Sequence, residues 1–91
     1  MNEREVRIVE AEVRRINNLV LRNLKGVDEL NRLTRNLETK YTRVIEKDTE
    51  TLSAFSRAKG YLGSAEDDLR LFGNEIMLAE DNLIIGLRKG V

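Results

Sequence analysis

The chain has 91 residues, contains no cysteine, histidine or proline, and carries sixteen basic and sixteen acidic residues, so its formal net charge is zero. This length accommodates one domain with a modest core, which needs well-packed helices or oligomerisation to be stable. The missing cysteines exclude a disulfide framework, and the balanced charge argues against a simple electrostatic grip on nucleic acid.

Apolar residues recur with a seven-residue period along the whole sequence. With Val6 at position a, nineteen of the twenty-four a and d positions are apolar, whereas a composition of 41% hydrophobic residues would place about ten there. This pattern predicts an all-α protein with coiled-coil or helical-bundle packing. Asn23 and Asp48 occupy core positions of the heptad and are candidates for polar layers that set the register.

The first predicted element is a long helical arm over residues 3–59. Asn2 is a candidate N-cap, and Glu5 stands three residues later, as in a capping box. Gly26 does not shift the heptad phase, and the region around Asp48 lacks a glycine that would close a helix, so we expect at most a bend at either place. A break near Gly26 or Asp48 would instead convert the hairpin into a three-helix bundle.

The predicted turn follows at residues 60–63, and a second helix is expected over residues 64–89. Two glycines there can take the left-handed conformation that closes a helix, and the serine after them is a good N-cap. The residues assigned to this turn are Gly60, Tyr61, Gly63 and Ser64. The sequence therefore predicts one domain, residues 1–91, folded as an antiparallel helical hairpin with a long N-terminal arm.

The two predicted arms differ in length, at about 38 Å for the second and about 85 Å for the first. The short arm would leave part of the apolar stripe uncovered, and exposed stripes of this kind mark interfaces. Residues 1–47 hold eleven bases and eight acids, and residues 64–91 hold three bases and six acids, so the arms attract each other weakly. The predicted partner-binding residues are Val6, Val9, Val13, Ile16, Val20, Val27 and Leu30.

The sequence contains no pattern typical of a catalytic, cofactor-binding or metal site. Without histidine or cysteine, the usual nucleophile–base pairs and the Glu-x-x-His metal motif of helical bundles are absent. The calcium-binding loop pattern and the phosphate-binding loop pattern are also absent. The basic residues Arg14, Arg15, Arg22 and Lys25 are diluted by acids and have no aromatic neighbours for base stacking, so nucleic-acid binding is a weaker alternative.

The segment Tyr61–Leu69, Y-L-G-S-A-E-D-D-L, resembles the W-x-G turn of the small helical-hairpin proteins of bacterial type VII secretion systems. Tyr61 takes the place of the tryptophan, which the chain lacks, and Gly63 takes the place of the glycine. Ala65 and Leu69 match the small and apolar positions that follow. The resemblance implies a hairpin that pairs with a second small protein or with the helical domain of a larger toxin. Because the C-terminal export motif is missing, it implies an escort rather than an exported substrate.

The leading hypothesis from the sequence is a non-enzymatic interaction protein that packs its apolar stripe against partner helices, either of its own kind or of another protein. The secretion escort is a narrower form of this hypothesis. No segment has the uninterrupted apolar core of a secretory signal or the length of a membrane span. We therefore expect a cytoplasmic protein without a cofactor and without a membrane partner.

Overall fold

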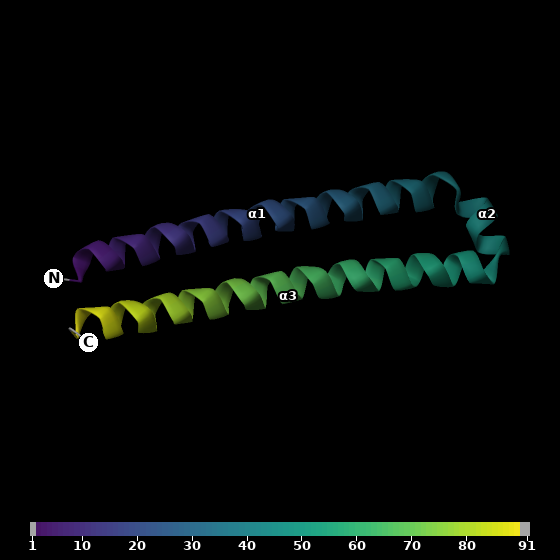
Figure 1. The fold of residues 1–91 in the computed structure, drawn as a ribbon. Coiled ribbons are helices and arrows are strands. Elements are labelled where there is room, and N and C mark those ends of the chain that lie inside the picture. The colour runs from purple at the N-terminus through teal and green to yellow at the C-terminus, as the bar shows by residue number, and fades with distance from the viewer. Residues whose placement is uncertain (1, 90–91) are drawn as a thin grey trace.

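The computed structural model describes residues 2–89, which form three helices and no strand. Helix α1 comprises Glu3–Lys40, α2 comprises Thr42–Lys47 and α3 comprises Thr49–Arg88. The long helices α1 and α3 lie side by side and antiparallel, and α2 forms the tip that joins them (Figure 1). The predicted all-α class and the antiparallel helical hairpin are confirmed.

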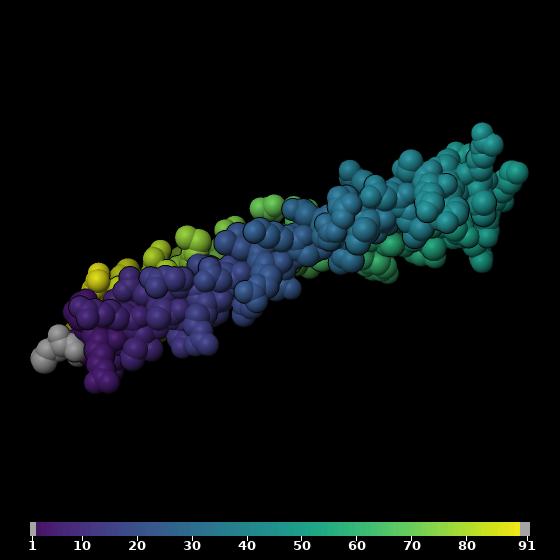
Figure 2. Space-filling model, turned by 90° about the horizontal axis from the view of Figure 1, so that it is seen from above, coloured from purple at the N-terminus to yellow at the C-terminus, as the bar shows by residue number. Residues whose placement is uncertain are grey.

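The hairpin is a narrow rod rather than a compact body. Its principal extents are 67 × 16 × 10 Å and its radius of gyration is 20.4 Å. A compact domain of this length would have a radius of gyration of about 12 Å. Figure 2 shows the rod from above, with α1 in front of α3 over its whole length. Away from the tip, each long helix therefore packs against one other helix of the chain and is open to solvent on its remaining sides.

Residues 41–48 reverse the chain because several local features oppose a continuous helix. Tyr41 leaves the helical conformation at φ −116° and ψ 27°. The hydroxyl of Thr42 donates to the carbonyls of Glu38 and Thr39, both at 2.9 Å, and so supplies the end of α1 with a side-chain partner. The short helix α2 that follows contains three β-branched residues, and Ile45 among them is buried beneath the tip.

Asp48 begins α3 as its N-cap. Its backbone is extended at φ −119° and ψ 104°. Its carboxylate accepts a hydrogen bond from the hydroxyl of Thr51 at 2.9 Å and another from the backbone N–H of Glu50 at 3.1 Å. Both hydrogen bonds favour the charged carboxylate and so hold the pKa of Asp48 below its ordinary value. The bond from the Thr51 hydroxyl is the larger of the two causes. The cap satisfies backbone donors that the start of a helix otherwise leaves free.

The predicted turn at residues 60–63 is wrong, and so are the predicted arms over 3–59 and 64–89. The residues Gly60, Tyr61, Gly63 and Ser64 all lie in the interior of α3. Neither glycine has a positive φ, so neither uses the conformation that would make glycine necessary. A glycine inside a helix costs only about 1 kcal/mol relative to alanine, whereas the capped break at Asp48 lets α3 pair with α1 over its full length.

The three-helix bundle does not form either. The chain passes through Gly26 as a continuous helix, and the break near Asp48 yields a six-residue α2 rather than a third long helix. The second arm therefore has 40 residues and nearly equals the 38 residues of α1.

The core is a single seam between α1 and α3. Among residues 2–89, the buried side chains are Val6, Val13, Val27 and Ile45. In the first half of α1 the seam follows the a and d positions of the heptad. In the second half it moves by one residue, so that Leu24, Asn31 and Glu38 turn inward in place of Asn23, Leu30 and Leu37. A helix of 3.6 residues per turn drifts against a seven-residue repeat, and this drift leaves apolar residues outside the seam.

The two predicted polar layers lie outside the seam. Asn23 is exposed, and its side-chain amide donates to the carbonyl of Leu19 in its own helix at 2.8 Å. Asp48 caps α3 at the tip. Neither residue sets the register within the hairpin.

Candidate interaction surface

The residues predicted to bind a partner mostly form the intrachain seam. Val6, Val13 and Val27 are buried, and Val9, Ile16 and Val20 are half-buried. Of the seven predicted residues, Leu30 alone is exposed. The prediction assumed a short second arm that could not reach them. Because α3 begins at Thr49, it is long enough to cover the apolar stripe of α1. The six predicted residues from Val6 to Val27 are therefore not free to bind a partner.

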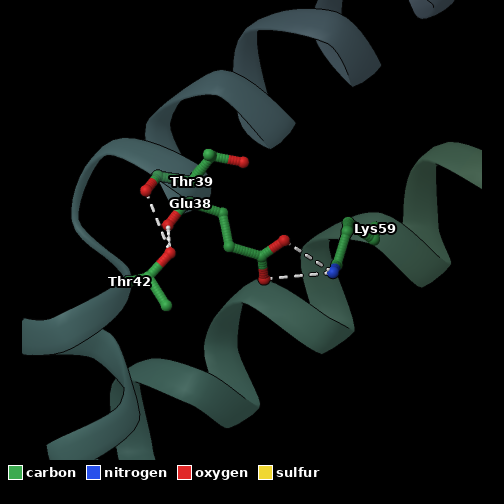
Figure 3. A network of polar contacts seen from close by, with 4 residues as sticks. All are labelled: Glu38, Thr39, Thr42 and Lys59. Atoms are coloured by element: carbon green, nitrogen blue, oxygen red, sulfur yellow. Dashed lines mark hydrogen bonds and ion pairs between the residues drawn. The ribbon is translucent and has the colours of Figure 1, made fainter.

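Contacts at three levels fix the register of the hairpin. At the open end, Nε of Arg88 lies 3.3 Å from a carboxylate oxygen of Glu3, and the side-chain amide of Asn2 donates to the carbonyl of Leu87. In the middle, a β-carbon built on Gly73 would lie 3.8 Å from Cγ1 of Val20. Near the tip, the ammonium of Lys59 donates to the carboxylate of Glu38 (Figure 3).

One long side of the hairpin carries charged side chains towards both ends and a more apolar groove in the middle. A shallow groove of about 490 Å³ runs there between Leu21 of α1 and Met77 of α3, with Gly73 at its base. A second groove joins residues 28–36 of α1 to Glu66 of α3. We call this the polar side; its outer residues include Glu3, Leu21, Asp28, Arg32, Glu66, Arg70, Met77 and Arg88.

The opposite side carries large apolar side chains from both long helices. At 3.6 residues per turn, these residues project from the flank of each helix that lies across the seam from the polar side. We call this the apolar side and define it by Ile8, Leu19, Leu30, Leu33, Leu37, Tyr61, Phe72 and Leu83. Each of these side chains is between 47% and 73% exposed. Large apolar side chains that gather in solvent on one side of a small protein favour the binding of another molecule there.

The apolar side is organised in layers spaced by eleven residues. Ile8, Leu19 and Leu30 follow this spacing in α1, and Tyr61, Phe72 and Leu83 follow it in α3. The contacts place Ile8 level with Leu83 and Leu19 within about two residues of the level of Phe72, whereas Leu30 lies level with residues 63–67, on the open-end side of Tyr61. Eleven residues are close to three helical turns, or about 16 Å, so each residue returns to the same flank of its helix.

Among residues 2–89 no group of acidic residues is arranged to hold a metal ion. The other displaced pKa values belong to surface pairs: a hydrogen bond from Arg32 lowers the pKa of Glu29, and hydrogen bonds from the arginines to their glutamates raise the pKa of Arg32 and of Arg70. Within residues 2–89, no helix is both long enough and apolar enough to cross a bilayer.

The four basic residues considered for nucleic acid are exposed on α1. Arg14, Arg15, Arg22 and Lys25 lie away from the seam. Glu12 stands 3.6 Å from Arg15 and reduces the local positive charge. No aromatic residue stands among them in α1, since Tyr41 is at the tip and Phe55, Tyr61 and Phe72 belong to α3.

Comparisons of the chain with protein-family models, with curated proteins and with solved structures found no match. The evidence for a functional surface therefore comes from the chain itself. Sequence reasoning missed most of the apolar side, although the eleven-residue spacing was visible in the sequence. The residues of the apolar side lie outside the seam between α1 and α3, which departs from the ideal heptad in the second half of α1. Only the pairing of the two helices shows that these residues lie on one side of the hairpin.

Proposed function

We propose that this protein is a non-enzymatic assembly protein that packs its apolar side against partner helices. The hairpin is the scaffold, and the binding surface is the set of large side chains outside the seam. This differs from the surface predicted from the sequence, of which Leu30 alone belongs to the apolar side. Burial of apolar area supplies the driving force, at roughly 25 cal/mol per Å² before the costs of association.

The observation that carries this proposal is the number of large apolar side chains that the hairpin leaves in solvent. The seam buries Val6, Val13 and Val27 and the tip buries Ile45, whereas eight large apolar side chains on the apolar side are 47% to 73% exposed. A small domain with so few buried residues gains little from its own core. Packing the apolar side against further helices would remove that surface from water and complete the core.

Site-specific photo-crosslinking in the cells that make the protein tests this function. A photoreactive phenylalanine analogue is placed at Leu19 or Phe72 on the apolar side, and in the control at Leu21 on the polar side. We expect covalent adducts to a protein from the first two positions and none from the control. Adducts from neither apolar position, or equally from all three, would contradict the proposal.

The secretion escort remains a hypothesis of the same class. The shape that it implies, a small helical hairpin, is present, but the segment that carried the resemblance lies inside α3 and forms no turn. An adduct between the apolar side and a larger helical toxin domain would support it. An adduct of the chain with itself would support simple self-assembly instead.

A further inference from the structure

We infer that the apolar side binds the apolar side of a second copy of this chain. The two hairpins stack face to face about a two-fold axis that runs along their length, with both tips at the same end. The product is a four-helix bundle in which α1 of each copy lies over α3 of the other. This inference rests on the proposed function and specifies its partner.

The exposed area matches what a dimer of this kind needs. The chain exposes 7439 Å², whereas a compact monomer of its 10.5 kDa mass would expose about 5,400 Å². The surplus is about 2,000 Å² per chain, and obligate homodimers bury about 2,000–5,000 Å² in total. Two hairpins therefore carry enough surplus surface to form such an interface without any further chain.

The distribution of charge selects the direction of stacking. Residues 1–47 hold eleven bases and eight acids, and residues 48–91 hold five bases and eight acids, so the first half is +3 and the second −3. With the axis along the hairpin, the positive α1 faces the negative α3 of the other copy on both sides of the bundle. An axis across the hairpin would place α1 on α1 and α3 on α3, so that like charges would meet. The net charge of zero also removes overall repulsion between two copies.

The layers on the apolar side are self-complementary under the same axis. A rotation about the length of the hairpin keeps every residue at its own level. The layer of Leu19 and Phe72 therefore meets the same layer of the second copy, and the Ile8–Leu83 layer does likewise. Near the tip, Leu37 would meet the small residue Ala58, which stands next to the Lys59 that pairs with Glu38. Alternation of large and small residues across facing helices favours close packing.

A polar level lies on the tip side of the Leu19–Phe72 layer. Asn23 and Asp68 are exposed on the two helices at levels about two residues apart, between the Leu19–Phe72 layer and the side chains of Leu30 and Tyr61. In the stacked dimer the amide of Asn23 faces the carboxylate of Asp68 from the other copy. A hydrogen bond between them would fix the register, which is a known use of polar residues in helical bundles.

The first test measures the mass of the full chain in solution by sedimentation over a wide range of concentrations. We expect twice the monomer mass of 10.5 kDa, with high helicity by circular dichroism. A chain that is folded and monomeric at all concentrations overturns the inference. So does a chain that is unfolded alone, because the second copy would then not be the missing partner.

A matched pair of double variants tests the surface. Leu19→Glu with Phe72→Glu places charge in the central layer of the apolar side, and we expect the dimer to dissociate. Leu21→Glu with Met77→Glu alters side chains of similar exposure, 59% and 54%, on the polar side, and we expect it to remain dimeric. Equal dissociation of both variants, or of neither, overturns the assignment of the interface.

A spin label at the tip tests the direction of stacking. The chain has no cysteine, so Arg43→Cys introduces a single attachment point. With both tips at one end, the distance between the two labels is well under half of the 67 Å length of the hairpin. A distance that approaches the full length overturns the stacking proposed here.

The crosslinking and the mass measurement separate this inference from the proposed function. Adducts from Leu19 and Phe72 to a different protein, together with a monomeric chain in solution, would leave the assembly function in place and eliminate the homodimer. Absence of adducts together with a monomeric chain would eliminate both. Adducts of two copies of the chain, with twice its mass, support both the assembly function and the homodimer.

Discussion

Lys59 of α3 donates from its ammonium group to both carboxylate oxygens of Glu38 in α1, at 2.9 and 3.0 Å. The pair joins the two arms close to the tip, and Thr42 binds the backbone carbonyl of the same Glu38 (Figure 3). The contact runs against the overall polarity of the arms, since here α3 supplies the base and α1 the acid. Its contribution is therefore to hold the register locally.

Removing either charge of this pair should lower stability slightly. The side chains of Lys59 and Glu38 are 39% and 26% exposed, so screening by solvent limits their interaction to about 0.5–1 kcal/mol. A double-mutant cycle with Lys59→Ala and Glu38→Ala, followed by urea unfolding at equal protein concentrations, should give a coupling of this size that falls with added salt. The control pair, Glu12 and Arg15 within α1, should give no measurable coupling. A coupling unaffected by salt would contradict an ionic origin.

The cap at Asp48 should make stability depend on acid pH. The folded-state pKa of Asp48 is depressed, so its contribution is complete above the unfolded-state value and is lost as the pH falls through the folded-state value. Asp48→Ala should lower the melting temperature at neutral pH by about 5 °C, because the first turn of α3 loses its acceptor. Asp48→Asn should retain most of the cap at neutral pH. Melting curves of both variants at pH 7 and pH 3 should show a smaller loss on acidification than in the parent.

Replacing the glycines of the former turn candidate should stabilise the protein. Gly60 and Gly63 lie in the interior of α3, and a β-carbon built at either meets nothing within 4 Å. Gly60→Ala and Gly63→Ala should each raise the free energy of unfolding by about 0.5–1 kcal/mol. In a turn with left-handed backbone, the same changes would destabilise the fold. Urea titration of the two variants therefore decides by its sign whether residues 60–63 are helical.

Truncating the seam should cost far more than truncating the polar side. Val13 is buried between the arms, and Val13→Ala removes two methyl groups and leaves a cavity, which should cost about 1–3 kcal/mol. Leu21 is exposed, and Leu21→Ala should stay within about 0.5 kcal/mol of the parent. If both changes cost the same, the seam between α1 and α3 is misplaced.

The fold class was predictable from the sequence because the heptad repeat extends over both arms. The position of the turn was not, because the two glycines at 60 and 63 are the usual signal for a helix end, and the real break uses weaker ones. Tyr41, Thr42 and Asp48 each interact only with residues near them in the sequence. The chain nevertheless turns at these residues and not at the glycines, because a turn in the middle lets two arms of nearly equal length pair along their whole length. The packing gained in this way joins residues far apart in the sequence, so no local signal reveals it.

The interaction surface was harder to predict for a related reason. A stripe in a sequence does not say which chain covers it. Val6, Val13 and Val27 were correctly identified as residues that need a neighbouring helix, but the neighbour is α3 of the same chain. Ile8 lies at heptad position c, which usually faces solvent, and Leu33 and Tyr61 lie at position g, at the edge of the seam. Their shared side therefore became evident only when the arms were placed in register.

The partners across the hairpin grow steadily more remote in sequence from tip to open end. Glu38 and Lys59 are separated by 21 positions, whereas Asn2 and Leu87 are separated by 85. A force that pulls the N-terminus and the C-terminus apart would therefore separate α1 from α3 one helical turn after another, beginning at the open end. At each moment the force would act mainly on the contacts of one level of the seam. On release, the tip would close first, since its loop is the shortest, and the remainder would follow it outward.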